Sequence, residues 1–325
     1  MTVVRPFSPE DVGSVTGLLL QDAAARQACD PALWALKPDA GTAVASFIEG
    51  ATQGGTPIRH GWTVAEEEGR ITGVAHSILL PVPPIYAGED GMPGLLMEDC
   101  AVAPDAPEGT AEALLEAAEA DLREAGARVL LASSVLPCAW TAALEGAGYE
   151  PLTLYYGARM DAAEGAVRLA GAEDIPGLVA QSAVNRDCLY AVDPFWKPHP
   201  EADARFESWM RKSLTLTDRD MLVTEAGGRV SGYAIAHPAT PLHLPAAHDP
   251  KGIGMIDDYF HEAFAEIGAE GVAGEALRLL QAAEAALAAR GARAGMVICP
   301  AGWTSKRGML EASGHEVALT WSIRR

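Results

Sequence analysis

The sequence predicts a mixed α/β fold built from two similar domains in tandem, each a central mixed sheet flanked by helices. The first observation is a repeat, because RPFSPEDVGSVTGLLL from Arg5 is echoed by RLAGAEDIPGLVAQS from Arg168. The second is that later segments recur in the same order along both halves. The third is length, since 325 residues suffice for two domains that each bury a core. We therefore expect domains at residues 1–163 and 164–325.

Capping and turn signals place the elements of the first half. Ser8 followed by Pro9 is typical of a helix start, so a helix up to about residue 20 is expected after a strand at 3–5. Gly69 in an acidic turn predicts a hairpin. The other expected elements are a helix at 42–49, hairpin strands at 62–65 and 71–79, a strand at 95–102, a helix at 108–125, a strand at 128–134, a helix at 141–145 and two final strands within 149–160.

The second half repeats this order of elements. We expect a strand near 167, a helix at 172–181, a hairpin at 221–237, a strand at 255–260, a helix at 271–289, a strand at 294–299, a helix at 305–312 and final strands to 323. Strands and helices that alternate in this way predict a mixed α/β domain in each half.

Composition and charge limit the classes of function. The chain is 49% hydrophobic and 21% charged, which is typical of a globular protein. Its formal charge of −20 disfavours nucleic acid and anionic membranes as partners and favours a small cationic molecule. No apolar run approaches a membrane span and no signal-peptide core is evident, so we expect a cytoplasmic protein. The oligomeric state is left open.

The cysteines and histidines do not indicate a metal site. The five cysteines form no CxxC pair, and we expect reduced, mostly buried thiols. The eight histidines show no HxxxH or HxH spacing, and His243 and His248 lack a third partner nearby in the sequence. No metal is therefore expected.

A glycine-containing loop stands between an acidic strand and an alanine-rich helix in both halves. The first half has MEDCAV followed by EGTAEALLEAAE, and the second has MIDDYFH followed by EGVAGEALRLLQAAE. This series resembles the GNAT superfamily of acyl-CoA-dependent N-acyltransferases, and it does so twice over nearly the whole chain. In that family the loop and the helix N-terminus bind the pyrophosphate of acetyl-CoA, through close backbone approach and the helix dipole. The resemblance implies these cofactor-binding residues: Gly109, Ala111, Gly268, Gly271, Ala273 and Gly274, with Lys306 and Arg307 for the adenosine phosphates.

Both halves depart from the family pattern. Ala106 and Gly268 stand where the family has Arg or Gln, and Glu108 and Glu270 precede the loop glycines. The tyrosine that usually serves as general acid is replaced by leucine at 144 and at 310. Its loss matters little, because a thiolate is an adequate leaving group near neutral pH.

The resemblance implies an N-acetyltransferase in which a small amine attacks the thioester directly in a ternary complex. An ammonium must lose its proton first, which costs about 4 kcal/mol at pH 7, so a general base is needed. The family's base lies on the fourth strand, which makes Asp257, Asp258 and Glu98 the candidates, with His261 nearby. We expect one carboxylate of each adjacent pair to face the cleft, because neighbouring residues on a strand point to opposite faces.

An aromatic wall is expected over the amine. Its candidates are Tyr190, Phe195, Trp196 and Tyr259. We favour the second half as the active one, with the first half supporting it. Two alternatives stay open, namely a non-catalytic or repurposed tandem GNAT-like protein that binds a small ligand, and an acyltransferase that uses a longer acyl chain.

Overall fold

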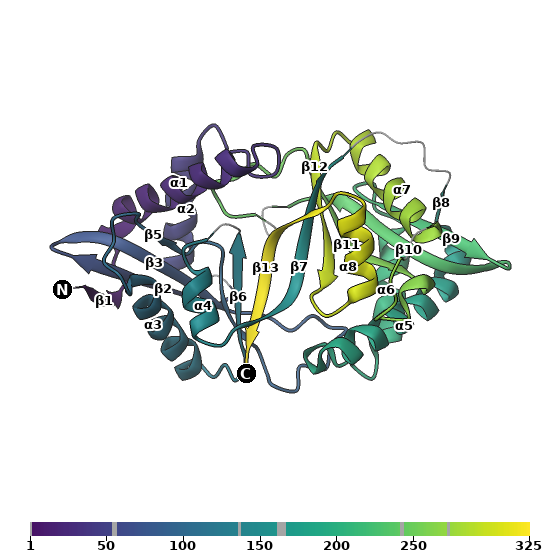
Figure 1. Ribbon diagram of the computed structural model, residues 1–325, viewed down its shortest axis with the longest axis horizontal. Helices are drawn as coiled ribbons and strands as arrows, with labels where there is room; N and C mark the ends of the chain where they lie inside the picture. The colour runs from purple at the N-terminus through teal and green to yellow at the C-terminus, as the bar shows by residue number, and fades with distance from the viewer. Residues whose placement is uncertain (1, 54–56, 136–137, 161–166, 241–243, 272–273) are drawn as a thin grey trace.

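The protein was analysed as a computed structural model that describes residues 2–53, 57–135, 138–160, 167–240, 244–271 and 274–325. One mixed sheet runs through the whole molecule (Figure 1). Its strand order is β1-β2-β3-β4-β6-β13-β7-β12-β11-β10-β9-β8, and β5 pairs with β3. The mixed α/β fold is thus confirmed, with the strands of both halves joined in a single sheet.

The first half contributes seven strands and four α-helices to the described part of the chain. The strands are β1 (Val3–Pro6), β2 (His60–Glu67), β3 (Arg70–Leu79), β4 (Gly94–Leu96), β5 (Ala101–Val102), β6 (Leu130–Val135) and β7 (Glu150–Arg159). The helices are α1 (Val12–Cys29), α2 (Ala40–Thr52), α3 (Thr110–Glu124) and α4 (Thr141–Gly146), with a 3₁₀ turn at Pro9–Asp11. Helices α1 and α2 lie on one side of β2 and β3 and α3 lies on the other (Figure 1).

The second half repeats the series. Its strands are β8 (Arg168–Leu169), β9 (Asp220–Ala226), β10 (Arg229–Pro238), β11 (Ile253–His261), β12 (Ala294–Pro300) and β13 (Glu316–Arg324). Its helices are α5 (Ile175–Val192), α6 (Ala202–Ser213), α7 (Glu275–Ala289) and α8 (Thr304–Ala312), with 3₁₀ turns at Ala172–Asp174, Pro194–Trp196 and Glu262–Phe264. Among the described residues, no helix is long and apolar enough to cross a membrane.

The two halves exchange their last strands. Strand β7 of the first half pairs with β12 of the second along seven residues, from Ala294 opposite Arg159 to Pro300 opposite Thr153. Strand β13 lies between β6 and β7 and is antiparallel to both. Neither half therefore has a complete sheet without the other.

Two loops repeat this reciprocity. The loop after β3 lies against the second half, where Tyr86 bridges Pro198 and the Ala87 amide donates to the Lys197 carbonyl at 2.8 Å. The loop after β10 lies against the first half, where His248 bridges Leu36 and the Lys37 amide donates to the Ala247 carbonyl at 2.9 Å. Each half therefore packs one of its loops against the other half.

The repeated Arg and Asp residues have a structural role. Arg5 donates two hydrogen bonds of 2.8 Å to Asp11, and Arg168 donates two of 2.7 Å to Asp174. Both aspartates are buried at the start of a helix. The Arg5 guanidinium lowers the pKa of Asp11 to about 2 despite burial. These pairs tie the first strand of each half to its first helix.

Several predicted boundaries were wrong. Helices α1 and α5 continue to Cys29 and Val192, well beyond residues 20 and 181. The strand expected at 95–102 is interrupted into β4 and β5, and each half ends in one long strand, not two. Helix α6 was missed, because its sequence ADARFESWMRKS has low overall hydrophobicity and its apolar face shows only in the fold. The boundary expected after residue 163 lies outside the described residues.

The exchange predicts that the halves unfold together. Leu319 on β13 is 2% exposed, so Leu319→Ala should lower the free energy of unfolding by about 2–5 kcal/mol. We expect a single shifted transition when urea unfolding is followed by circular dichroism and by tryptophan fluorescence. The control is Val3→Ala, at a 52% exposed position on the edge strand, which should change little. Two separate transitions, only one of them shifted, would contradict the coupling.

Candidate functional site

Strands β11 and β12 diverge in the second half. They pair in parallel from Ile253 opposite Ala294 to Ile256 opposite Val297, and β11 then continues only along β10 as far as His261. A β-bulge occurs at this point, because Asp258 and Ile256 face successive residues of β10 and Asp257 is left over. The bulge lies next to the gap between the diverging strands.

A cavity of about 320 Å³ lies at this divergence. It is lined by β11, β12, α5 and α6 of the second half. The first half contributes Tyr86 from the loop after β3 together with Thr153 and Tyr155 from β7. We call it the C-terminal cavity. Both the exchanged strand and the docked loop are needed to build it.

Asp258 is a half-buried acid of the cavity. Tyr233 donates to its Oδ1 at 2.7 Å, and the Asn185 side-chain amide donates to the same oxygen at 3.2 Å. Burial raises the pKa of Asp258 to about 6, although the Tyr233 hydrogen bond works in the other direction. The carboxyl is therefore ionised at neutral pH and protonates in mild acid.

Asp257 lines the same cavity. His237 Nε2 lies 3.1 Å from its Oδ2. Burial is the largest single influence and opposes the charge on His237, but the hydrogen bond to Asp257, the charge of Asp257 and the Pro238 carbonyl together outweigh it and raise the pKa of the imidazole. The expected division of Asp257 and Asp258 between opposite faces was wrong, because the bulge breaks the regular alternation and both residues reach the cavity.

The remaining wall is largely aromatic. It includes Tyr86, Trp196, Trp209 and Trp321, and the Tyr86 and Trp196 rings lie 5.1 Å apart. Three buried polar atoms of lining residues have no hydrogen-bond partner among the described residues, namely Trp196 Nε1, Thr153 Oγ1 and Asp257 Oδ1. Buried polar atoms are rarely left unsatisfied, so they indicate a site for a polar ligand or water.

Beyond the C-terminal cavity, the gap between β11 and β12 is closed by contacts from the start of α8. Trp303 Nε1 donates to the Phe264 carbonyl at 3.0 Å, and the Ser305 amide donates to the Ile267 carbonyl at 2.8 Å. Lys306 Nζ donates to the Tyr259 carbonyl at 2.7 Å. Trp303 is fully buried and Lys306 is 4% exposed. The carbonyls of β11 and of the segment that follows it are thus bound by the start of α8.

Lys306 is therefore a buried side chain bonded to the backbone and not a free surface cation at a phosphate site. Its Nζ is 5.1 Å from the centre of the Tyr259 ring and 5.7 Å from that of Trp303. Burial lowers the pKa of the ammonium. Its side chain also lines the C-terminal cavity. Lys306 therefore remains a functional candidate, at this cavity and not at the adenosine phosphates.

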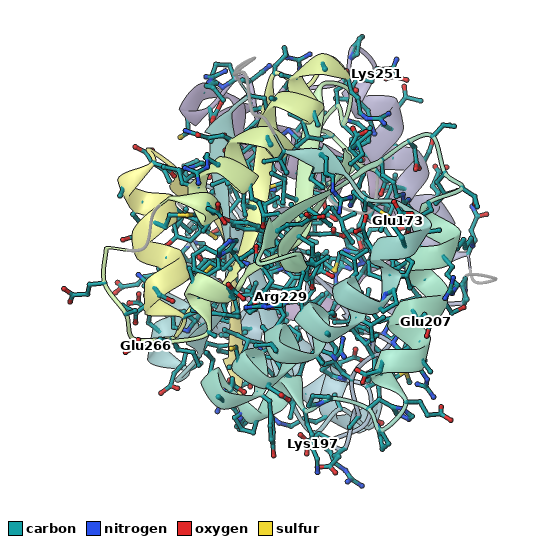
Figure 2. All side chains as sticks on the ribbon, turned by 90° about the vertical axis from the view of Figure 1, so that its right-hand side faces the viewer. Glu173, Lys197, Glu207, Arg229, Lys251 and Glu266 are labelled. Carbon is teal, nitrogen blue, oxygen red and sulfur yellow. The ribbon has the colours of Figure 1, made fainter. Side chains whose placement is uncertain are left out.

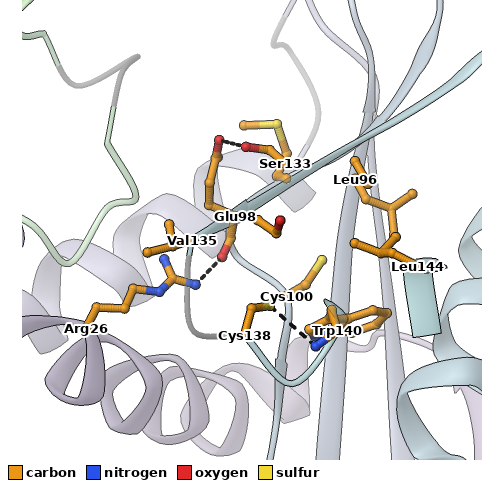
Figure 3. Close-up of a pocket in the computed structure, with 12 residues that line it drawn as sticks. Arg26, Leu96, Glu98, Cys100, Ser133, Val135, Cys138, Trp140 and Leu144 are labelled. Carbon is orange, nitrogen blue, oxygen red and sulfur yellow. Dashed lines mark hydrogen bonds between the residues drawn. The ribbon is translucent and has the colours of Figure 1, made fainter. Parts of the chain in front are cut away.

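The corresponding gap in the first half is filled. Strands β4 and β6 pair only at Gly94–Leu96, and the hollow beyond them measures about 10 Å³. Figure 3 shows Ser133 donating to the Glu98 carboxylate and Arg26 reaching the Glu98 carbonyl, which it contacts at 2.6 Å. Trp140 also lines this hollow and is 3% exposed. Burial raises the pKa of Glu98. This space holds about one water molecule.

The described residues do not fit acetyl-CoA in either half. The second half would have to break the contacts of Trp303, Ser305 and Lys306 to admit a pantetheine arm. In the first half, Trp140 occupies the corresponding space. The α3 N-terminus there follows Gly109, whose φ is 84°, and the preceding loop presents Asp105 and Glu108 instead of a basic side chain. Asp105 is paired with Arg70.

Of the other predicted site residues, His261, Arg307, Tyr190 and Phe195 do not line the C-terminal cavity. His261 is buried outside the cavity, where its Nδ1 accepts from the Ala263 amide. Arg307 contacts Tyr156, Ala301 and Glu311. Tyr190 is 43% exposed, and Phe195 lines a neighbouring hollow. Tyr259 lines the C-terminal cavity, while its hydroxyl donates to the Ala276 carbonyl on the α7 side.

The predicted glycine loops stand apart from the cavity. Gly271 and Gly274 both have a φ of 69°, so they form turns that glycine favours. Gly268 and Gly109 have open space at the Cβ position. Ala111 is buried at the start of α3. Ala273 lies outside the described residues.

Sequence reasoning missed the residues that come from the first half. Tyr86, Thr153 and Tyr155 are remote in sequence from Asp258, and the exchange that brings them together leaves no local signal. The proline-rich run PVPPIY at 81–86 does mark an unusual loop. Among the described residues, no group of three His, Cys, Asp or Glu is placed to hold a metal ion.

Comparison with solved structures identifies the fold. A GCN5-related N-acetyltransferase from Sphaerobacter thermophilus superposes with a TM-score of 0.57 at 16% identity, over 99% of this chain and 95% of that chain. A tandem GNAT protein from the clavulanic acid biosynthesis pathway gives a TM-score of 0.49 at 16% identity, over 99% and 97%. The sequence matches no protein-family model and no curated protein. The chain has the GNAT fold, the fold of the GCN5-related N-acetyltransferases.

Proposed function

We propose that the C-terminal cavity binds a small organic cation such as a protonated amine. The single observation that supports this most is Asp258, a half-buried carboxylate held by Tyr233 and Asn185 inside a cavity with an aromatic wall. A buried carboxylate is costly unless an opposite charge or hydrogen bonds compensate it. An amine ligand supplies both.

The aromatic residues favour the same class of ligand. Tyrosine and tryptophan faces attract cations by about 0.5–2 kcal/mol each when water is excluded. Trp196 and Tyr86 stand on one side of the cavity, and Asp257 adds a second carboxylate. Lys306 and Arg186 also line the cavity, and each already has a partner, since Lys306 Nζ donates to the Tyr259 carbonyl and Arg186 pairs with Asp203.

Acyl transfer to the amine is the second candidate function. The GNAT fold favours it, and so does the pKa of about 6 for Asp258, which suits a general base near neutral pH. The closed gap between β11 and β12 opposes it. Ligand binding without acyl transfer is therefore the function that the geometry supports best.

Asp258→Asn should weaken amine binding at least tenfold, because the neutral amide keeps the shape and the hydrogen bonds but loses the charge. Isothermal titration calorimetry at pH 7.5 with a panel of small primary, secondary and quaternary amines measures this. The matched control is Asp187→Asn, an exposed acid on the same helix as Asn185, which should bind as the wild type does. Equal binding by Asp258→Asn and the wild type would remove the proposal.

Amine binding should also depend on pH. Asp258 must be ionised to attract a cation, and its pKa is about 6. The affinity should therefore be constant above pH 7 and fall by about tenfold per unit once the pH is well below 6. The Asp258→Asn variant should lack this fall. A wild-type affinity that stays level down to pH 5 would show that another group provides the charge.

Asp258 should lower stability at neutral pH. Its folded pKa of about 6 lies above the usual value of 3.8 for an aspartate, so the folded state binds the proton more tightly than the unfolded state does. Stability from this group is present near pH 4 and is lost as the pH rises through 6, by up to about 3 kcal/mol. Asp258→Asn should thus be more stable than the wild type in urea at pH 8 and equal to it at pH 4. Destabilisation at pH 8 would contradict this sign.

A further inference from the structure

A second hollow of about 290 Å³ adjoins the C-terminal cavity. Its walls come from the loop after β3, from residues 194–197, from Val129 and from the end of β13. Leu80, Val82 and Phe195 are among the apolar side chains that line it. Lys197 and Glu89 pair with each other at its rim at 2.6 Å, and Figure 2 shows Lys197 at the periphery of the molecule. We call this space the apolar hollow.

The apolar hollow and the C-terminal cavity meet at shared side chains. Pro83, Tyr86, Trp196 and Trp321 line both. The two spaces therefore share part of their walls. Trp196 Nε1, which has no partner among the described residues, belongs to this shared wall. A ligand with its polar end near Asp258 would have to pass Tyr86 and Trp196 to enter the apolar hollow.

The apolar lining is a property of these residues and not of the fold. The first half has a hollow of similar size, about 290 Å³, between residues 29–34 and the end of β7. Residues 30–34 match 193–196 in the repeat, as DPALW against DPFW. That hollow is lined by Asp30, Arg159 and Glu316 as well as by Leu33, Trp34 and Val317. The hollow in the second half has the more apolar lining of the two, although Glu89, Asp90, Lys197 and Arg325 also line it.

We propose that the apolar hollow takes the alkyl chain of the ligand whose cationic head binds at Asp258, so that the ligand is an amphiphilic amine. The inference rests on the proposed function, since it extends the ligand of the same cavity. The two spaces offer complementary chemistry to such a molecule. Carboxylates and aromatic faces suit an ammonium head, and an apolar hollow suits a hydrocarbon tail.

The test is calorimetry with butylamine, hexylamine, octylamine and decylamine, all below their micelle-forming concentrations. Each added methylene should raise the affinity by about fourfold until the hollow is full. Val82→Trp should abolish this gain by filling the hollow, and Phe195→Ala should shift the optimum to a longer chain by enlarging it. The control is Met92→Trp, in the same loop at a 49% exposed position, which should behave as the wild type. Thermal melts confirm that each variant is folded.

The outcomes separate this inference from the proposed function. Short amines that bind through Asp258 with no gain from chain length would overturn the apolar hollow and leave the cation site standing. A gain from chain length that is equal for octanol and octylamine, and unchanged in Asp258→Asn, would overturn the cation site and with it the linked ligand. The proposal requires both the chain-length gain and the loss with Asp258→Asn, and it requires opposite shifts in the Val82 and Phe195 variants.

Discussion

The insertion of β13 between β6 and β7 is the constraint on which the rest of the structure depends. A strand in the centre of a sheet has its backbone groups bonded on both sides, so it cannot leave without exposing two edges. Because β7 in turn pairs with β12, the second half has no complete sheet of its own. The C-terminal cavity follows from this exchange, since β7 supplies Thr153 and Tyr155 and β13 supplies Trp321 to its wall.

Backbone carbonyls that lose their partners where two strands diverge can be bonded in two ways. Where β11 leaves β12, its carbonyls need hydrogen-bond donors. A ligand lying between the strands supplies donors in one arrangement. Here the chain itself supplies a donor, since Lys306 binds the Tyr259 carbonyl of β11, and Trp303 and Ser305 bind carbonyls of the segment that follows. The cavity on the α5 and α6 side remains open, so a binding site persists although the gap itself is closed. This separation of the two sides is why we place ligand binding ahead of acyl transfer.

The repeat made the fold predictable from the sequence, because it gave two independent views of each element. The ion pairs of Arg5 and Arg168 explain why those residues recur. The acids of β11 came from the resemblance to the GNAT superfamily, which places an acid on this strand, and both line the C-terminal cavity. The role of Lys306 was not predicted, because an isolated lysine near a helix start is indistinguishable in sequence from a surface charge. The bulge at Asp257 and the contribution of Tyr86 depend on strand register and on the docking of remote segments, and neither leaves a local pattern.

The most direct test of this account is a crystal structure determined in the presence of both octylamine and acetyl-CoA. The account predicts density for the amine beside Asp258, no acetyl-CoA between β11 and β12, and Trp303 still bonded to the Phe264 carbonyl. Acetyl-CoA bound between these strands, with Trp303 and Lys306 displaced from their carbonyl partners, would contradict it.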